Sequence, residues 1–248
     1  MYLLSDKIAV VTGVSSGIGW AIVNTFIGHG ARVIGVARRD PPALENSFST
    51  GAFTFLRGDV STQATLDVVA EAAAQTHGHI DILVNNAAID SPPASIDTVT
   101  DSDWERVLQI NLLSVARLST RLLPLMRSAR DGRIINIGSV LSMYAVPLAG
   151  PYVVSKHALL GLTRQQALEY GRIGITANCL LPGAIDTEMF RRGDENGEFR
   201  RYAESRCPLG RIADPREIAA TALFLASPLS SYINGHALVA DGGLTIGI

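Results

Sequence analysis

A tyrosine and a lysine stand four residues apart, as Tyr152 and Lys156, at the start of a segment with helical period. Residues with this spacing lie on one face of a helix, so the phenol and the ammonium can reach the same space. A free phenol is a poor base near neutral pH, and a nearby positive charge stabilises its anion, so the pair could handle a proton. Only two of the 21 basic residues are lysines, and chance would supply such a pair about 0.05 times. The alternative is a solvated helix face.

Further polar residues stand where predicted strands end or where a helix is apolar. Ser139 follows the apolar run Ile134–Ile137 through Gly138. Asn111 lies in a helical segment with apolar flanks, where a buried amide must find hydrogen-bond partners. Two other strand ends carry the segments Asn85-Asn86-Ala87-Ala88 and Pro182-Gly183-Ala184-Ile185-Asp186-Thr187. Several predicted strand ends are therefore followed by polar residues or glycines.

A glycine-rich loop follows the first predicted strand and precedes a helical segment: Thr12-Gly13-Val14-Ser15-Ser16-Gly17-Ile18-Gly19. Free amide groups and the helix dipole converge at such a helix start, which makes it an anion site. Glycines allow close approach of the backbone to a diphosphate, and Ser15 and Ser16 offer hydroxyl donors. The loop therefore predicts a dinucleotide site, although an ordinary tight turn would have a similar sequence.

The same loop also matches the Gly-x-Ser-x-Gly elbow of serine hydrolases, with Ser15 as the nucleophile. Such an elbow needs an earlier strand and loop to supply half of its oxyanion hole. Only twelve residues precede Gly13, which is too few to build them. His236 could complete a triad, but nothing in the sequence brings it to Ser15. We keep the hydrolase as an alternative hypothesis.

The elements that must position these residues alternate between short apolar runs and longer segments of helical period. Continuous apolar runs are typical of strands buried on both faces. Strand–helix–strand repetition predicts an α/β fold: one Rossmann-like domain over residues 1–248, with a doubly wound parallel sheet and helices on both faces. Sites in such sheets lie beyond the carboxyl ends of the strands. The predicted strands are Ile8–Thr12, Val33–Ala37, Phe53–Leu56, Ile80–Val84, Ile134–Ile137, Ile175–Leu181 and Ala237–Ala240. The predicted helices lie near 17–28, 62–77, 102–127, 152–171 and 215–226.

Composition restricts the class of protein. The chain has 248 residues, of which 47% are hydrophobic, and a formal net charge of −2. This balance supports a full core and argues against nucleic acid or an anionic membrane as a partner. Two cysteines cannot form a disulfide framework, and no apolar stretch approaches the ~20 residues of a spanning helix. We therefore expect a soluble cytoplasmic protein. His77-Gly78-His79 has no partnering acid or cysteine pattern, so we expect no metal site.

Taken together, the motifs resemble those of the short-chain dehydrogenase/reductase family, in its compact single-domain branch. The resemblance covers nearly the whole chain and follows the order of the family. A small departure is Ala88, where the family more often has glycine. The matching motifs are Thr12-Gly13-x3-Gly17-x-Gly19, Asp59-Val60, Asn85-Asn86-Ala87-Ala88, Asn111, Ser139, Tyr152-x3-Lys156, Pro182-Gly183 and Thr187.

The resemblance implies an oxidoreductase that transfers a hydride between a nicotinamide cofactor and a secondary alcohol or ketone, without a metal. Tyr152 would exchange the proton, and Lys156 would lower its pKa and bind the nicotinamide ribose. Ser139 would stabilise the substrate oxygen, and Asn111 would hold a water in a proton relay. An inactive NAD(P)-binding regulatory protein is the other alternative. The implied cofactor-binding residues are Gly13, Ser15, Ser16, Gly17, Ile18, Gly19, Arg38, Asp59, Val60, Asn85, Ala87, Tyr152, Lys156, Pro182, Gly183, Ile185 and Thr187.

The end of the second strand predicts a preference for NADP(H), with NAD(H) as a possible second cofactor. NAD-preferring relatives usually place an Asp at the position of Ala37, whereas Arg38 offers a guanidinium to a 2′-phosphate. Asp40 is expected to pair with Arg38 or Arg39 and to soften this preference.

The resemblance also implies a homotetramer and a substrate-covering loop at about 188–210, over a small carbonyl or alcohol substrate. The candidate pocket residues are mostly apolar, which favours a cyclic, aryl or aliphatic ketone. They are Ile89, Leu141, Met143, Tyr144, Leu148, Met189 and Phe190.

Overall fold

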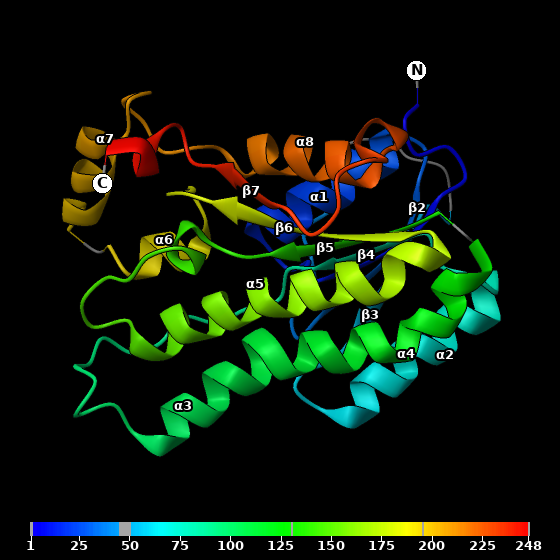
Figure 1. Cartoon of the computed structure of the whole chain (residues 1–248), viewed down its shortest axis with the longest axis horizontal. Coiled ribbons are helices and arrows are strands. Elements are labelled where there is room, and N and C mark those ends of the chain that lie inside the picture. The colour runs from blue at the N-terminus through cyan, green and yellow to red at the C-terminus, as the bar shows by residue number, and fades with distance from the viewer. Residues whose placement is uncertain (1, 45–50, 130, 195, 248) are drawn as a thin grey trace.

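A parallel sheet of seven strands, in the order β3-β2-β1-β4-β5-β6-β7, forms the centre of the molecule (Figure 1). The computed structural model describes residues 2–44, 51–129, 131–194 and 196–247. Strand order reverses between β1 and β4, where sheets of this type bind ligands. The predicted doubly wound α/β fold is confirmed. The strands are β1 (Ile8–Thr12), β2 (Arg32–Ala37), β3 (Phe53–Arg57), β4 (Ile82–Asn85), β5 (Gly132–Ile137), β6 (Ile175–Pro182) and β7 (Ala237–Ala240).

Helices cover both faces of the sheet. In Figure 1, α1 (Gly17–Gly28) and α8 (Pro215–Ala226) lie above it, and α2 (Gln63–His77), α4 (Ser114–Ala129) and α5 (Gly150–Tyr170) lie below. Every residue of β1, β4 and β5 is buried, because these strands pack against a helix layer on each side. β7 lies at one edge and is only half-buried along its length. The carboxyl ends of the parallel strands therefore lie along one side of a core that helices cover on both faces.

The segment predicted as one helix over 102–127 consists of three pieces. α3 (Asp101–Leu108) leads into the π-helical turn η1 (Gln109–Leu113), which leads into α4. A π-turn inserts an extra residue into the helical register, and such turns are frequent at functional sites. Asn111 lies inside this turn. The predicted helical segment is confirmed over residues 101–129, but its π-turn was not predicted, because apolar periodicity does not reveal a single wide turn.

Two short helices lie in the segment predicted as a loop, α6 (Glu188–Arg192) and α7 (Glu198–Arg206). Both lie beside the carboxyl ends of the strands, at the left in Figure 1. Of the residues in the two helices, Ala203 alone is buried. They therefore lack the apolar stripe by which a helix is recognised in sequence. No helix in the described part of the chain is both long and apolar enough to cross a membrane.

Candidate active site

Tyr152 and Lys156 lie on the first turns of α5 and face the end of β5, which leads into Ser139. The ammonium of Lys156 is almost fully buried, and its Nζ donates a hydrogen bond to the Ile137 carbonyl oxygen at 2.9 Å. The same Nζ lies 5.5 Å from the centroid of the Tyr152 ring. The Ser139 side chain acts on the same phenol, because its hydrogen bonding tends to lower the pKa of Tyr152. Three of the residues implied as catalytic are thus brought together at one strand end.

Burial sets the protonation of this pair. It raises the pKa of Tyr152 well above its usual range, the charge of Asp90 adds to this, and the hydrogen bond with Ser139 opposes it. Burial also lowers the pKa of Lys156 to about 8, against the opposing charges of Cys179 and Asp90. At neutral pH the pair therefore stands as a phenol beside an ammonium. In this state Tyr152 has a proton to donate.

Asn111 clamps the loop after β4 to α5. Its Oδ1 accepts from the Ile89 backbone N–H at 2.9 Å, and its Nδ2 donates to the Ile89 carbonyl at 2.9 Å. Nδ2 also donates to Ser155 Oγ at 3.1 Å, and that hydroxyl donates to the Tyr152 carbonyl at 2.7 Å. A continuous chain of hydrogen bonds therefore runs from this loop to Tyr152. Both N–H donors of the Asn111 amide are used within the protein, so its side chain positions the loop.

The glycine-rich loop fits a diphosphate, because α1 begins without a side-chain cap. Its N-cap residue, Ser16, makes no capping hydrogen bond, and the first turn carries no acidic residue. A Cβ at Gly19 would lie 2.3 Å from the Gly13 carbonyl oxygen, so only glycine allows this tight loop. A Cβ at Gly17 would lie 3.1 Å from Thr187 Cγ2, which brings the segment after β6 against the loop.

The two adjacent asparagines after β4 have different tasks. Asn86 fastens the glycine-rich loop, because its Nδ2 donates to the carbonyls of Thr12 and Gly13 at 2.9 and 3.2 Å. Asn85 points the other way and donates to Asn136 Oδ1 at 2.8 Å inside the core. The side chain of Asn85, a sequence-predicted site residue, is thus engaged in the core. Ala87 donates its backbone N–H to Thr12 Oγ1 at 3.0 Å, next to the loop.

Arginines at the end of β2 face carboxylates on two other segments. Arg38 lies 3.9 Å from Asp59, which precedes the buried Val60, and both Arg38 and Arg39 are exposed. Arg39 pairs with Glu188. The expectation that Asp40 pairs with one of these arginines was wrong, because Asp40 pairs with Arg57 on β3. β3 is the parallel neighbour of β2, and Ala37 is in register with Arg57.

The remaining predicted cofactor residues line the same edge. Pro182 ends β6, and Gly183 follows it so tightly that a Cβ there would lie 2.8 Å from Asp241 Cβ. Ile185 is buried, and Thr187 caps α6 by accepting from the Phe190 N–H at 3.2 Å. Ile18 packs against the core under α1, and Ser15 is half-buried in the loop.

Asp90 is a residue of the site that the sequence reasoning missed. It is exposed, its Oδ1 accepts from the Ser91 backbone N–H at 2.8 Å, and the surrounding protein raises its pKa. Its charge acts on both Tyr152 and Lys156. The signal in the sequence that could have indicated Asp90 is its position shortly after the motif at residues 85–88. An acidic group therefore acts on a site where mostly apolar residues were expected. Of those apolar residues, Met143, Leu148 and Met189 are exposed.

A family model described as enoyl-(acyl carrier protein) reductase matches residues 13–245. The chain is 36% identical to a 3-oxoacyl-(acyl-carrier-protein) reductase of Vibrio cholerae, over 97% of this chain and 98% of that protein. It is 35% identical to a mitochondrial borneol dehydrogenase of Lavandula x intermedia, over 98% and 92% of the two chains. The chain belongs to the short-chain dehydrogenase/reductase family. A gluconate 5-dehydrogenase from Burkholderia cenocepacia, solved with NADP and tartrate, superimposes with a TM-score of 0.89 at 32% identity, covering 100% of this chain and 98% of that one.

Family membership confirms the predicted class of activity, an NAD(P)-dependent oxidoreductase that acts on alcohol and ketone groups. The fold also argues against the serine hydrolase. Ser15 follows β1 and lies at the carboxyl edge of the parallel sheet, whereas His236 precedes β7 and lies at the opposite edge. Within the described ranges, no histidine is hydrogen-bonded to Ser15, and no group of three His, Cys, Asp or Glu side chains could hold a metal ion.

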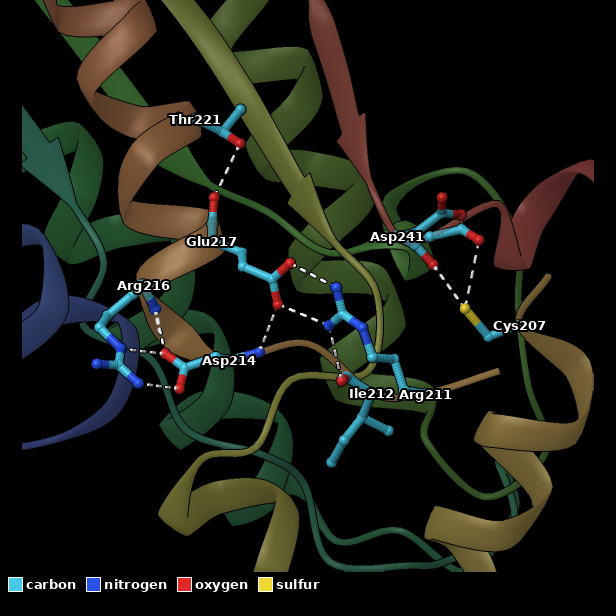
Figure 2. A network of polar contacts seen from close by, with 9 residues as sticks. Cys207, Arg211, Ile212, Asp214, Arg216, Glu217, Thr221 and Asp241 are labelled. Carbon is cyan, nitrogen blue, oxygen red and sulfur yellow. Dashed lines mark hydrogen bonds and ion pairs between the residues drawn. The ribbon is translucent and has the colours of Figure 1, made fainter. Parts of the chain in front are cut away.

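The chain after α7 is joined to α8 by a polar network (Figure 2). Arg211 pairs with Glu217 through two hydrogen bonds of 2.7 Å, and Asp214 forms a capping box with Glu217 at the start of α8. Cys207 Sγ donates to the Gly242 carbonyl at 3.3 Å. A cavity of about 190 Å³ beside this network is lined by Ala203, Ile218 and Asp241, among others, and not by Tyr152 or Lys156.

Proposed function

We propose that Tyr152 is the general acid and base of a reversible carbonyl reduction, with Ser139 and Lys156 as its partners. The observation that carries this is the grouping of phenol, hydroxyl and buried ammonium at the end of β5, beside the uncapped start of α1. A bound nicotinamide would supply or accept the hydride. Ser139 would hydrogen-bond the substrate oxygen, and Tyr152 would give it a proton. Lys156 would favour the tyrosinate formed in this way.

We further propose that residues 1–248 act as one catalytic domain, with Asn111 in the proton relay and the segment 188–210 as the substrate cover. The double clamp of Ile89 by Asn111 supports a positioning task in this relay. The substrate proposed is a small secondary alcohol or ketone with an apolar body. Asp90 offers one hydrogen-bond acceptor to a donor on that substrate.

NADP(H) is the cofactor we propose as preferred. The exposed guanidinium of Arg38 and its loose contact with Asp59 support this, because a phosphate dianion would be a stronger partner. The similar gluconate 5-dehydrogenase was solved with NADP. The implied binding residues are those of the glycine-rich loop, Arg38, Asp59, Val60 and the segments after β4 and β6.

The test is a panel of aliphatic, cyclic and aryl ketones and keto acids, each with NADPH and NADH, followed by nicotinamide absorbance. We expect turnover of at least one ketone and a higher kcat/KM with NADPH. Arg38→Ala should lower kcat/KM with NADPH by about tenfold or more and leave NADH nearly unchanged. Arg57→Ala, an exposed arginine on the neighbouring strand, is the matched control. No turnover across the panel would favour the inactive NAD(P)-binding protein. An unchanged cofactor preference in Arg38→Ala would show that Arg38 does not bind the 2′-phosphate.

We also propose a cytoplasmic homotetramer. Large apolar side chains are exposed on the outer faces of η1 and α5 and near the carboxyl terminus, and β7 is a half-buried edge strand. An interface between subunits would cover such side chains. The exposed residues include Leu113, Val154, Leu168, Leu229, Tyr232 and Ile246. Light scattering at micromolar concentration should give four times the monomer mass, and a monomeric mass would refute the proposal.

A further inference from the structure

The first residue of α6, Glu188, binds two groups of the cofactor edge at once. Arg39 donates to it through both guanidinium branches, from Nη2 to Oε2 at 2.7 Å and from Nη1 to Oε1 at 3.1 Å. The hydroxyl of Ser16 donates to the same Oε2 at 3.3 Å. Arg192, one helical turn on, also pairs with Glu188. The start of the substrate-covering segment is thereby fastened to the glycine-rich loop and to the end of β2.

The groups that hold Glu188 are those that an anion would use. Arg39 presents a planar fork of donors, which matches a carboxylate and a phosphate equally well. Ser16 is the N-cap residue of α1, yet its hydroxyl serves Glu188 and leaves the helix start uncapped. Arg38, the neighbouring residue, is loosely paired and exposed. A carboxylate of the chain itself therefore occupies a ready-made anion site beside the predicted cofactor.

We propose that Glu188 competes with the 2′-phosphate of NADP(H) for Arg39 and Ser16, so that this phosphate releases the start of the substrate-covering segment. The inference rests on the proposed NADP(H) site and adds a specificity-determining residue to it. NADH has no such phosphate and would leave the contact in place. Glu188 would then weaken NADP(H) binding and, at the same time, link the identity of the cofactor to the position of α6.

The exchange is physically accessible. The hydrogen bond from Arg39 and the charges of both arginines lower the pKa of Glu188 to about 2, so the carboxylate is charged throughout the physiological range. The side chains of Glu188 and Arg39 are 37% and 58% exposed, and exposed ion pairs contribute little net stability. The far end of the segment is held separately by Arg211 and Glu217 (Figure 2). Release would therefore concern α6 and leave the attachment to α8 intact.

Adenosine 2′,5′-bisphosphate and 5′-AMP isolate the effect of the 2′-phosphate, and calorimetry gives their Kd without turnover. Glu188→Gln keeps the shape of the side chain and removes its charge. We expect this variant to bind adenosine 2′,5′-bisphosphate about three- to tenfold more tightly and 5′-AMP unchanged. Glu204→Gln, which removes a carboxylate of α7 that pairs with Arg200 at 3.8 Å, is the matched control and should alter neither Kd.

Trypsin cleavage at Arg191 and Arg192 reports directly on α6. In wild type, adenosine 2′,5′-bisphosphate should speed this cleavage and 5′-AMP should not. An equal gain for both ligands in Glu188→Gln, an unchanged Kd, or slower cleavage with the bisphosphate would overturn the competition while leaving the proposed cofactor site standing. Failure of both ligands to bind any variant would overturn the cofactor site and this inference with it.

Discussion

Replacing Tyr152 by phenylalanine should lower kcat by about 10²–10⁴-fold, the range expected when a positioned proton donor is lost. The phenyl ring keeps the shape of the side chain and its place near the Lys156 ammonium, 5.5 Å from the ring centroid. What disappears is the hydroxyl that carries the proton and whose pKa Ser139 tends to lower. The glycine-rich loop lies on another strand end, so the Kd for the cofactor should stay within about twofold of wild type.

The matched control for this variant is Tyr170→Phe, near the other end of α5. Tyr170 is partly buried and lies away from the catalytic pair, so its loss should change kcat by less than about twofold. Kinetics with the ketone found in the panel, together with cofactor titration by fluorescence, would separate chemistry from binding. Near-normal turnover by Tyr152→Phe would rule out this tyrosine as the proton donor.

The sheet could be predicted well from the sequence, because its strands are buried on both faces. β1 and β7 begin and end where the apolar runs do, and the other strands differ by one or two residues at their ends. α1 and α8 also match their predicted ranges, because both helices bury much of their apolar surface in the core. The π-turn around Asn111 and the short helices α6 and α7 could not be found in this way. Neither feature leaves an apolar period in the sequence.

For the candidate site, the sequence could indicate which edge of the sheet holds the residues, but not the direction in which each side chain points. Asn85 and Asn86 are adjacent, and successive side chains at a strand end point to opposite faces. Which of them meets the glycine-rich loop is decided by Asn136 on the neighbouring strand, which takes Asn85 into the core. The pairing of Arg39 with Glu188 spans 149 residues of sequence. Only the folded chain brings these charges together.

Lys156→Met is expected to lower kcat/KM by about 10²–10⁴-fold and to weaken cofactor binding. Methionine fills a similar volume but carries no charge. The buried ammonium beside the Tyr152 ring would be gone, and the tyrosinate that must form during alcohol oxidation would lose its stabilising partner. In the direction of alcohol oxidation, the rising, acidic limb of the pH–rate profile should therefore move to higher pH. A Lys156→Met variant with wild-type turnover would contradict the assignment.

Measuring the stability of Lys156→Met distinguishes a loss of activity from misfolding. Activity should fall in this variant, whereas stability at neutral pH should not. The folded protein lowers the pKa of Lys156 from 10.5 to about 8. Between these values the unfolded chain binds more protons than the folded one, so wild-type stability rises with pH there, and below pH 8 the full cost of the buried ammonium remains. At pH 7, Lys156→Met should therefore be no less stable than wild type, with a gain of at most about 3 kcal/mol, and should lack that rise. Denaturant unfolding of the protein without cofactor at pH 7 and pH 10 measures both effects. A clear loss of stability at pH 7 would mean that the hydrogen bond from Lys156 to Ile137 outweighs the cost of burying the charge.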